Sequence, residues 1–300
     1  MSNGFLYVIW GDQRFVREVC GSVTSLRRHS PGAHATVVCD VPPAALPQLS
    51  SCLDRVITQP IDPRVARELL PHLAGFTYKV RNMYEHAPYE RTCFVDSDTY
   101  FLADFQPLFD ILDYFDMAMT LPPGDITPTR ANGKELQGYT PYNTGMILFK
   151  KGERTERFFD RWSFWQGALD EPDYTGSDQE TFMRALLDVP CRICVLQSTW
   201  NTRTQVYERL RGPVRLIHGR HADFEAIARN INITSDTRVW VPGVDLCLYD
   251  RMSMAHHWKY CVKATWLLWR QWLRELGRPP RKPWQPGSAS TRRQSSTLPS

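Results

Sequence analysis

The sequence predicts an α/β fold, with a Rossmann-like, mixed but mostly parallel sheet flanked by helices. Three observations predict it. Apolar stretches alternate with segments of helical spacing through the first hundred residues. The 300 residues are 42% hydrophobic, which suffices for the core of one large domain. An acidic cluster directly follows one apolar stretch, where open α/β sheets place their ligands.

The first half of the chain alternates between expected strands and helices. Helical spacing at 15–28 ends at Ser30-Pro31-Gly32, which stops a helix. The expected strands are 5–10, 35–39, 55–58 and 92–95, and the expected helices are 15–28, 64–73 and 78–86.

The second half continues with less regular alternation. A polar loop rich in Gly and Pro is expected at 122–141. The expected strands are 115–121, 142–149, 191–196 and 214–218, and the expected helices are 154–169, 178–187 and 224–229. Without a repeat or a clear linker, we expect one domain over 1–250, a basic Trp-rich helix within 251–277 and a disordered tail at 278–300.

Charge argues against nucleic acid as a partner. The formal charge is +4, and the tail contributes five basic residues and no acid, so residues 1–277 carry about −1. Eight cysteines are scattered through apolar stretches, and the lone Cys191-x-x-Cys194 has no second pair to complete a zinc site. We expect buried free thiols, a reducing compartment and a cytoplasmic location, since no secretory signal or membrane-spanning run is apparent.

The strongest local motif is Phe94-Val95-Asp96-Ser97-Asp98. Side chains two apart in extended backbone share a face, so Asp96 and Asp98 can converge on one divalent cation. Two clustered carboxylates repel each other unless a cation offsets their charge. The alternative is a polar turn after a strand, because Asp and Ser are common turn residues.

Four further motifs follow this one in a fixed order. They are Tyr142-Asn143-Thr144-Gly145-Met146, Gly176-Ser177-Asp178-Gln179-Glu180, Trp200-Asn201 and Leu216-Ile217-His218-Gly219, with Lys79 upstream of all. From about residue 5 to 220, the chain resembles glycosyltransferase family 8 and related GT-A enzymes, the group of glycogenin and bacterial lipopolysaccharide galactosyltransferases. The resemblance implies the GT-A fold and metal-dependent transfer of a hexose-type sugar from a nucleotide-diphosphate donor, with retention. It implies a UDP-sugar donor, Mn²⁺ or Mg²⁺, and a glycan, lipid-linked or protein acceptor.

The resemblance also implies roles for individual residues. Asp96, Asp98 and His218 would ligate the metal, a set that suits a hard cation. Donor contacts would come from Asp96, Lys79, Asp12, Gly219 and Arg220, and residues facing the transferred sugar would be Asn143, Asp178 and Gln179. Family members usually carry Lys-Pro-Trp shortly after the histidine. Here Arg220 or His221 would replace that lysine, and Phe15 stands where many relatives have a tyrosine beside the base.

Each assignment has a structural alternative. Lys79 could be a solvated helix residue, with Arg81 competing for its role, and Asn143 could cap a loop. Asp178 follows Ser177 at a helix start, so helix capping explains either residue. His218 could be a histidine buried in the core. For the whole protein, the alternatives are an inactive nucleotide-sugar-binding protein and a nucleotidyltransferase, although Trp10-Gly11-Asp12 is poor in glycine for a phosphate loop.

The segment 255–274 combines two stripes at helical spacing. One is apolar and Trp-rich, and the adjacent one is basic. The apolar stripe is Trp258, Val262, Trp266, Trp269 and Leu273, and the basic stripe is Lys259, Lys263, Arg270 and Arg274. We expect the Trp stripe to pack on the domain and the basic edge to stay free for a peripheral membrane contact. The alternative is a helix lying with its Trp face in a membrane surface.

Overall fold

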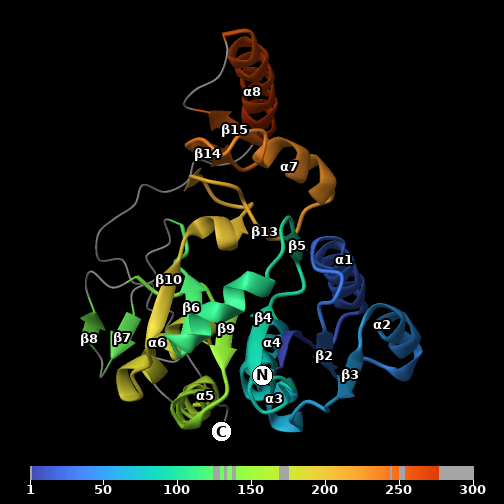
Figure 1. The fold of residues 1–300 in the computed structure, drawn as a ribbon, viewed down its shortest axis with the longest axis vertical. Helices are drawn as coiled ribbons and strands as arrows, with labels where there is room; N and C mark the ends of the chain where they lie inside the picture. The colour runs from blue at the N-terminus through green and yellow to red at the C-terminus, as the bar shows by residue number, and fades with distance from the viewer. Residues whose placement is uncertain are drawn as a thin grey trace, which may run out of the picture.

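The computed structural model describes residues 2–123, 129–131, 134–136, 140–168, 176–243, 245–249 and 254–276. At its centre is a seven-stranded sheet with the order β10-β6-β9-β4-β1-β2-β3 (Figure 1). The strands are β1 (Asn3–Ile9), β2 (Ala35–Cys39), β3 (Arg55–Thr58), β4 (Arg91–Val95), β6 (Met117–Thr120), β9 (Met146–Lys150) and β10 (Ile193–Leu196). β9 is antiparallel to its neighbours β4 and β6, and the other pairs are parallel. The expected mixed, mostly parallel sheet is therefore confirmed.

Helices cover both faces of this sheet. Its inner strands β6, β9, β4, β1 and β2 are mostly buried on both sides, which explains why they read as continuous apolar runs. In β4, for example, Cys93 and Val95 face one core and Phe94 faces the other. The first core is covered by α1 (Gln13–His29), α2 (Leu46–Cys52) and the 3₁₀ segment η2 (Gln106–Asp113). The second is covered by α4 (Pro71–Met83), α5 (Glu153–Gln166) and α6 (Asp178–Asp188).

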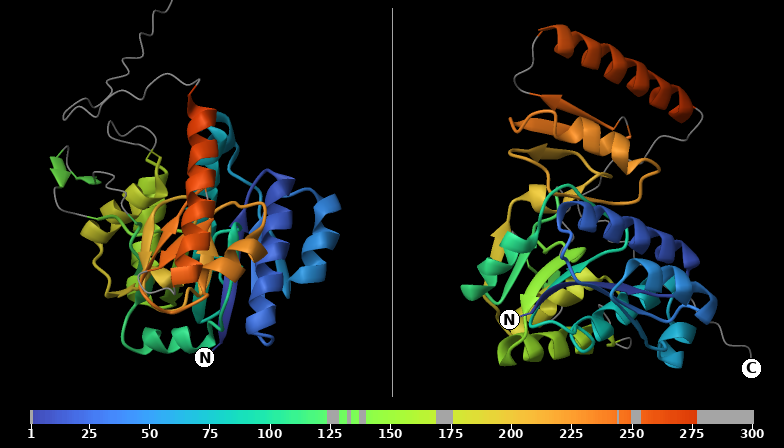
Figure 2. Two further views of the ribbon diagram at one scale, coloured as in Figure 1. Left: turned by 90° about the horizontal axis from the view of Figure 1, so that it is seen from above. Right: turned by 45° about the vertical axis from the view of Figure 1, so that its right-hand side comes forward.

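Smaller sheets lie beyond the carboxyl ends of the parallel strands. One has the order β11-β13-β5, and the other has the order β12-β14-β15 beside α7. Figures 1 and 2 show these elements between the large sheet and α8, which forms one end of the molecule. Their bounds are β5 (Thr99–Phe101), β11 (Thr202–Arg203), β12 (Glu208–Leu210), β13 (Leu216–His218), β14 (Arg238–Val241), β15 (Leu246–Tyr249), α7 (Phe224–Ile231) and α8 (Met254–Glu275). The remaining elements are α3 (Pro63–Glu68), η1 (Pro43–Ala45), η3 (Ser198–Trp200) and the hairpin β7 (Thr129–Ala131)–β8 (Lys134–Leu136).

Several expected boundaries were wrong. Helices expected at 64–73 and 78–86 are instead α3 and α4, because Leu69 and Leu70 are extended and Pro71 then begins α4. The strand expected from 142 begins only at Met146. Sequence analysis also missed α2, η2, β5, the strands after His218, and the hairpin within 122–141.

The expected packing of the Trp stripe was wrong as well. Trp258, Trp266 and Trp269 are exposed, at 73%, 52% and 55%. Among the α8 side chains that the structure describes, Leu267 packs against the small cluster of Val241 and Leu246. No helix within the described residues is long and apolar enough to cross a membrane. The tail at 278–300 and the side chains of Lys259 and Arg274 lie outside the described residues.

The cysteines are less uniformly buried than expected. Three are buried (Cys39, Cys93 and Cys247), four are half-buried (Cys20, Cys52, Cys191 and Cys194), and Cys261 is exposed. Sequence alone could not separate these groups, because all lie in apolar stretches.

Candidate active site

Asp96 and Asp98 lie where the chain leaves β4 and enters β5. The backbone N–H of Asp96 donates to the carbonyl of Gly145 at 2.9 Å, so the strand-to-loop junction is held by the neighbouring β9 segment. The carbonyl of Asp98 accepts from the N–H of Gly219 at 2.9 Å. Both aspartates therefore sit on backbone that is fixed from two sides.

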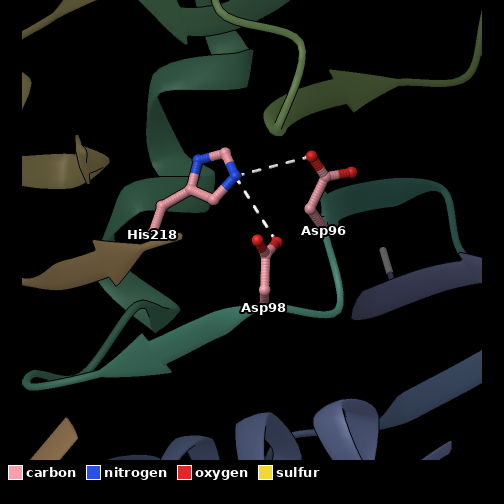
Figure 3. Close-up of side chains that lie close together, drawn as sticks. All are labelled: Asp96, Asp98 and His218. Carbon is pink, nitrogen blue, oxygen red and sulfur yellow. Dashed lines mark ion pairs between the residues drawn. The ribbon is translucent and has the colours of Figure 1, made fainter. Parts of the chain in front are cut away.

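β5 brings His218 to these carboxylates across more than a hundred residues of sequence. β5 and β13 are antiparallel, and His218 is opposite Thr99. The imidazole Nε2 lies 3.5 Å from Oδ2 of Asp96 and 3.6 Å from Oδ1 of Asp98. Figure 3 shows the ring pointing toward both carboxylates. The three candidate ligand atoms all lie within 4.8 Å of one another.

Asn201 orients the imidazole ring. Its Oδ1 lies 3.0 Å from Nδ1 of His218, and both side chains are buried. If Nδ1 carries the proton and donates to this oxygen, the lone pair of Nε2 faces the carboxylates. Second partners of this kind are typical of metal-ligating histidines.

Gly145 leaves the room that the three side chains need. A Cβ at this position would lie 2.1 Å from Cε1 of His218 and 2.9 Å from Oδ2 of Asp96. Only a residue without a side chain fits beside the cluster. Two carboxylates and an oriented imidazole suit a hard divalent cation, whose charge would offset the repulsion between the carboxylates.

Lys79 joins this cluster to Asp178. Its Nζ lies 3.6 Å from Oδ1 of Asp96 and forms a close ion pair with Oδ2 of Asp178, which also accepts from Oγ1 of Thr144 at 2.8 Å. Burial opposes the charge on Lys79, but the attraction of Asp178 and Asp96 outweighs it and raises the lysine's pKa. Burial likewise opposes the charge on Asp96, but Lys79 and His218 hold the carboxyl's pKa well below its usual range.

Asn143 presents an unused donor near this cluster. Its Oδ1 accepts from the N–H of Gly145 at 2.9 Å, while Nδ2 is buried without a hydrogen-bond partner among the described residues. Nδ2 of Asn201, whose Oδ1 contacts His218, is in the same state. Because buried polar atoms are normally paired, these two amide groups beside the cluster are candidates to donate to a ligand.

Arg220 is a second basic residue close to the aspartates. Its Nη1 lies 3.9 Å from Oδ2 of Asp98, and its Nε donates to Oε1 of Glu18 at 2.8 Å. Oε2 of Glu18 accepts from Oγ of Ser97 at 2.6 Å, so α1 anchors both the arginine and the loop between the aspartates. The guanidinium is also 5.4 Å from the ring centroid of Phe15. A cleft of about 640 Å³ is lined by Glu18, Asp98 and Arg220, among others.

Sequence and structure comparisons bear on this geometry. Residues 92–198 match the model of the nucleotide-diphospho-sugar transferase family. The matched segment includes Asp96, Asp98, Asn143 and Asp178. A search of curated proteins finds no match to the chain.

Several solved structures with a similar fold are glycosyltransferases. The galactosyltransferase LgtC, in complex with donor and acceptor sugar analogues, aligns with a TM-score of 0.53 at 16% identity, covering 74% of this chain and 88% of its own. Mouse xyloside xylosyltransferase 1 aligns with a TM-score of 0.50 at 14% identity, and the alignment covers 73% of this chain and 98% of that protein's chain. The glycosyltransferase GlyE of Streptococcus pneumoniae TIGR4 aligns with a TM-score of 0.51 at 14% identity, and the alignment covers 94% of this chain and 66% of that protein's chain. The chain thus has the GT-A fold expected from its motifs.

In the structure, most of the expected site residues lie close together. Lys79 is buried beside two aspartates, whereas its competitor Arg81 pairs with Asp62 at 2.9 Å. Asp12 does not join the cluster, since its carboxylate caps α1 by accepting from the N–H of Arg14. Gln179 is half-buried at the start of α6.

Sequence analysis missed Glu18. In the sequence it reads as an ordinary polar position of an amphipathic helix, although its side chain is half-buried. Only the fold shows that it contacts Ser97 and Arg220.

Proposed function

We propose that this protein is a metal-dependent glycosyltransferase that moves a hexose-type sugar from a UDP-sugar to an acceptor hydroxyl, with retention of configuration. The convergence of Asp96, Asp98 and His218 carries the proposal. The family match and the GT-A fold support the donor class, and the site offers what a charged diphosphate needs.

Asp96, Asp98 and His218 would hold a divalent cation, for which we propose Mn²⁺ or Mg²⁺. When bound, such a cation supplies neutralising charge for the diphosphate leaving group. Arg220 can clamp phosphate oxygens with its guanidinium, which Glu18 positions. The backbone N–H of Gly219 donates to the carbonyl of Asp98, so the backbone of Gly219 lies beside the proposed metal site. This chain's own contribution is therefore binding and orientation of the donor.

The sugar-facing side would be formed by Asn143, Asp178 and Gln179. The unpaired Nδ2 of Asn143 can donate to a sugar hydroxyl. Asp178 is buried and held by Lys79 and Thr144, which favours a positioning role. We therefore assign no covalent nucleophile.

Metal-supported nucleotide binding tests the proposal. We expect UDP to bind in titration calorimetry when Mn²⁺ is present and to bind weakly in chelator. Asp98→Ala should lower the Mn²⁺-supported affinity for UDP by roughly 100-fold. Losing a residue that only supports a metal ligand typically costs about 10- to 100-fold in metal affinity, and losing the ligand itself should cost at least the upper end of that range. Unchanged UDP affinity in Asp98→Ala would contradict the metal site. An inactive sugar-binding protein would bind UDP-sugar in this assay without turnover.

We also propose that α8 contacts an anionic membrane surface. Its exposed Trp and Leu side chains are accompanied by exposed Lys263 and Arg270, and residues 254–274 contain no acid. The composition suits the headgroup region, where each basic residue contributes about 1 kcal/mol of attraction.

Vesicle binding tests this contact. Replacing both Lys263 and Arg270 with Gln should weaken binding to phosphatidylserine vesicles by about 2 kcal/mol, or roughly 30-fold, and reduce its salt dependence. Arg209→Gln with Arg211→Gln is the matched control, since it removes two exposed basic residues that lie outside α8. Equal binding by wild type and the α8 variant would end the membrane proposal.

A further inference from the structure

Two cysteines from different helices meet on the side of the sheet covered by α1. Cys20 lies within α1, and Cys52 is the last residue of α2. Their Sγ atoms are 2.6 Å apart, about 0.6 Å longer than a disulfide bond. Both side chains are half-buried, so small solutes can reach them.

The local structure holds the two sulfurs in this position. Sγ of Cys20 lies 3.5 Å from the carbonyl of Gln48, and Sγ of Cys52 lies 3.4 Å from the carbonyl of Leu49. Gln48 and Cys52 are four residues apart on α2, so they share the helix face that packs against α1. Each cysteine is also partly packed against the hydrophobic core. Little movement is needed for the sulfurs to bond.

We propose that Cys20 and Cys52 are a redox-active pair that forms a disulfide between α1 and α2 when the protein meets a low-molecular-weight disulfide. This modification site is separate from the proposed metal cluster and does not depend on the transferase activity. In a reducing compartment the bond would be transient.

The reaction proceeds by two thiol–disulfide exchanges. The Cys20 thiolate attacks one sulfur of the small disulfide, forms a mixed disulfide and releases one small thiolate. Cys52 then loses its proton to solvent and attacks the Cys20 sulfur, which releases the second small thiolate. The protein thiols lose two electrons and the small disulfide gains them. Hydrogen bonding from Cys52 lowers the pKa of Cys20, which favours Cys20 as the attacking thiol.

The bond would fasten α2 to a helix that also supports the candidate site. On α1, Glu18 contacts Ser97 and Arg220, and Ser22 lies 2.7 Å from Oγ1 of Thr99. Closing the 32-residue separation between the cysteines reduces the entropy of the unfolded chain, so the oxidised protein should be more stable.

Mass spectrometry of the whole protein tests the pair. The reduced full-length chain is equilibrated with oxidised glutathione under native conditions, and free thiols are then blocked with N-ethylmaleimide. We expect the oxidised protein to carry two fewer N-ethylmaleimide groups than the reduced protein treated in the same way, and to yield one cross-linked peptide joining Cys20 to Cys52. The Tm should rise by several degrees and fall back in dithiothreitol.

Serine variants supply the controls. Cys20→Ser and Cys52→Ser should each abolish the cross-link and the dithiothreitol-sensitive rise in Tm, while Cys191→Ser, at another half-buried cysteine, should leave both unchanged. The proposal is overturned if oxidised glutathione leaves Cys20 and Cys52 unreacted. Stable glutathione adducts on both residues, or a cross-link between other cysteines, would overturn it equally.

Discussion

Replacing Gly145 with Ala should destroy the candidate metal site while leaving the fold intact. The added Cβ would lie 2.1 Å from Cε1 of His218, about 1.3 Å short of the 3.4 Å at which ordinary contact begins. The imidazole cannot easily retreat, because it is buried and its Nδ1 is held by Asn201. Oδ2 of Asp96, at 2.9 Å from the new atom, is crowded as well.

The size of the effect follows from this displacement. Metal–ligand distances are reproduced within about 0.2 Å in working sites, so a shift of about 1 Å removes a ligand. We therefore expect Mn²⁺ affinity, measured by calorimetry with UDP present, to fall by roughly 100-fold or more. A methyl group forced into a packed site should also cost about 1–3 kcal/mol of folding stability, measured by urea unfolding.

Gly32→Ala is the matched control. Gly32 lies in the turn after α1, its φ is outside the left-handed region and a Cβ added there would meet nothing within 4 Å, so alanine should leave Mn²⁺ affinity unchanged and raise stability by about 0.4–1 kcal/mol. If Gly145→Ala kept wild-type Mn²⁺ affinity, the cluster of Asp96, Asp98 and His218 would not be the metal site.

Two further substitutions separate metal binding from stability. His218→Ala should lower Mn²⁺ affinity, measured by calorimetry, by roughly 100-fold. It should change the free energy of unfolding, measured by urea titration, by only about 1 kcal/mol. A variant that binds Mn²⁺ as tightly as the wild type would show that this histidine is structural. Glu208 is buried, and this raises its pKa from 4.5 to about 7. The folded state therefore binds more protons than the unfolded state between these values, and stability falls as the pH rises through that window. Glu208→Gln should remove this loss. The free energy of unfolding of the variant minus that of the wild type should therefore increase by about 3 kcal/mol from pH 4.5 to pH 8. If this difference did not change with pH, the raised pKa of Glu208 would be refuted.

Much of the fold could be predicted because local patterns decided it. The inner strands of the large sheet are mostly buried on both faces, so each reads as an apolar run, and β2 and β4 are followed by the polar residues Asp40 and Asp96. The boundary between α3 and α4 could not be placed, since apolar periodicity continues through the extended residues before Pro71.

The site could be predicted only where its residues stand in recognisable motifs. Asp96, Asp98 and His218 carried such a signal. Glu18 acts through contacts that depend on how α1 packs, which leaves no local pattern. Asn201 stands in a recognised motif, but its contact with His218 depends on the fold, so the sequence assigned it no role. Trp266 illustrates the same limit, because an apolar stripe at helical spacing predicts a helix but not whether the stripe is covered.

The most direct test of the account is turnover of UDP-sugars by the full-length protein. UDP-hexoses are incubated singly without acceptor, with Mn²⁺ or with excess chelator, and released UDP is measured. We expect slow hydrolysis of at least one UDP-hexose with Mn²⁺, none in chelator, and none by Asp98→Ala. UDP release that persists in chelator or in Asp98→Ala would contradict metal-dependent transfer, and no release from any UDP-hexose with Mn²⁺ present would contradict the proposed donor.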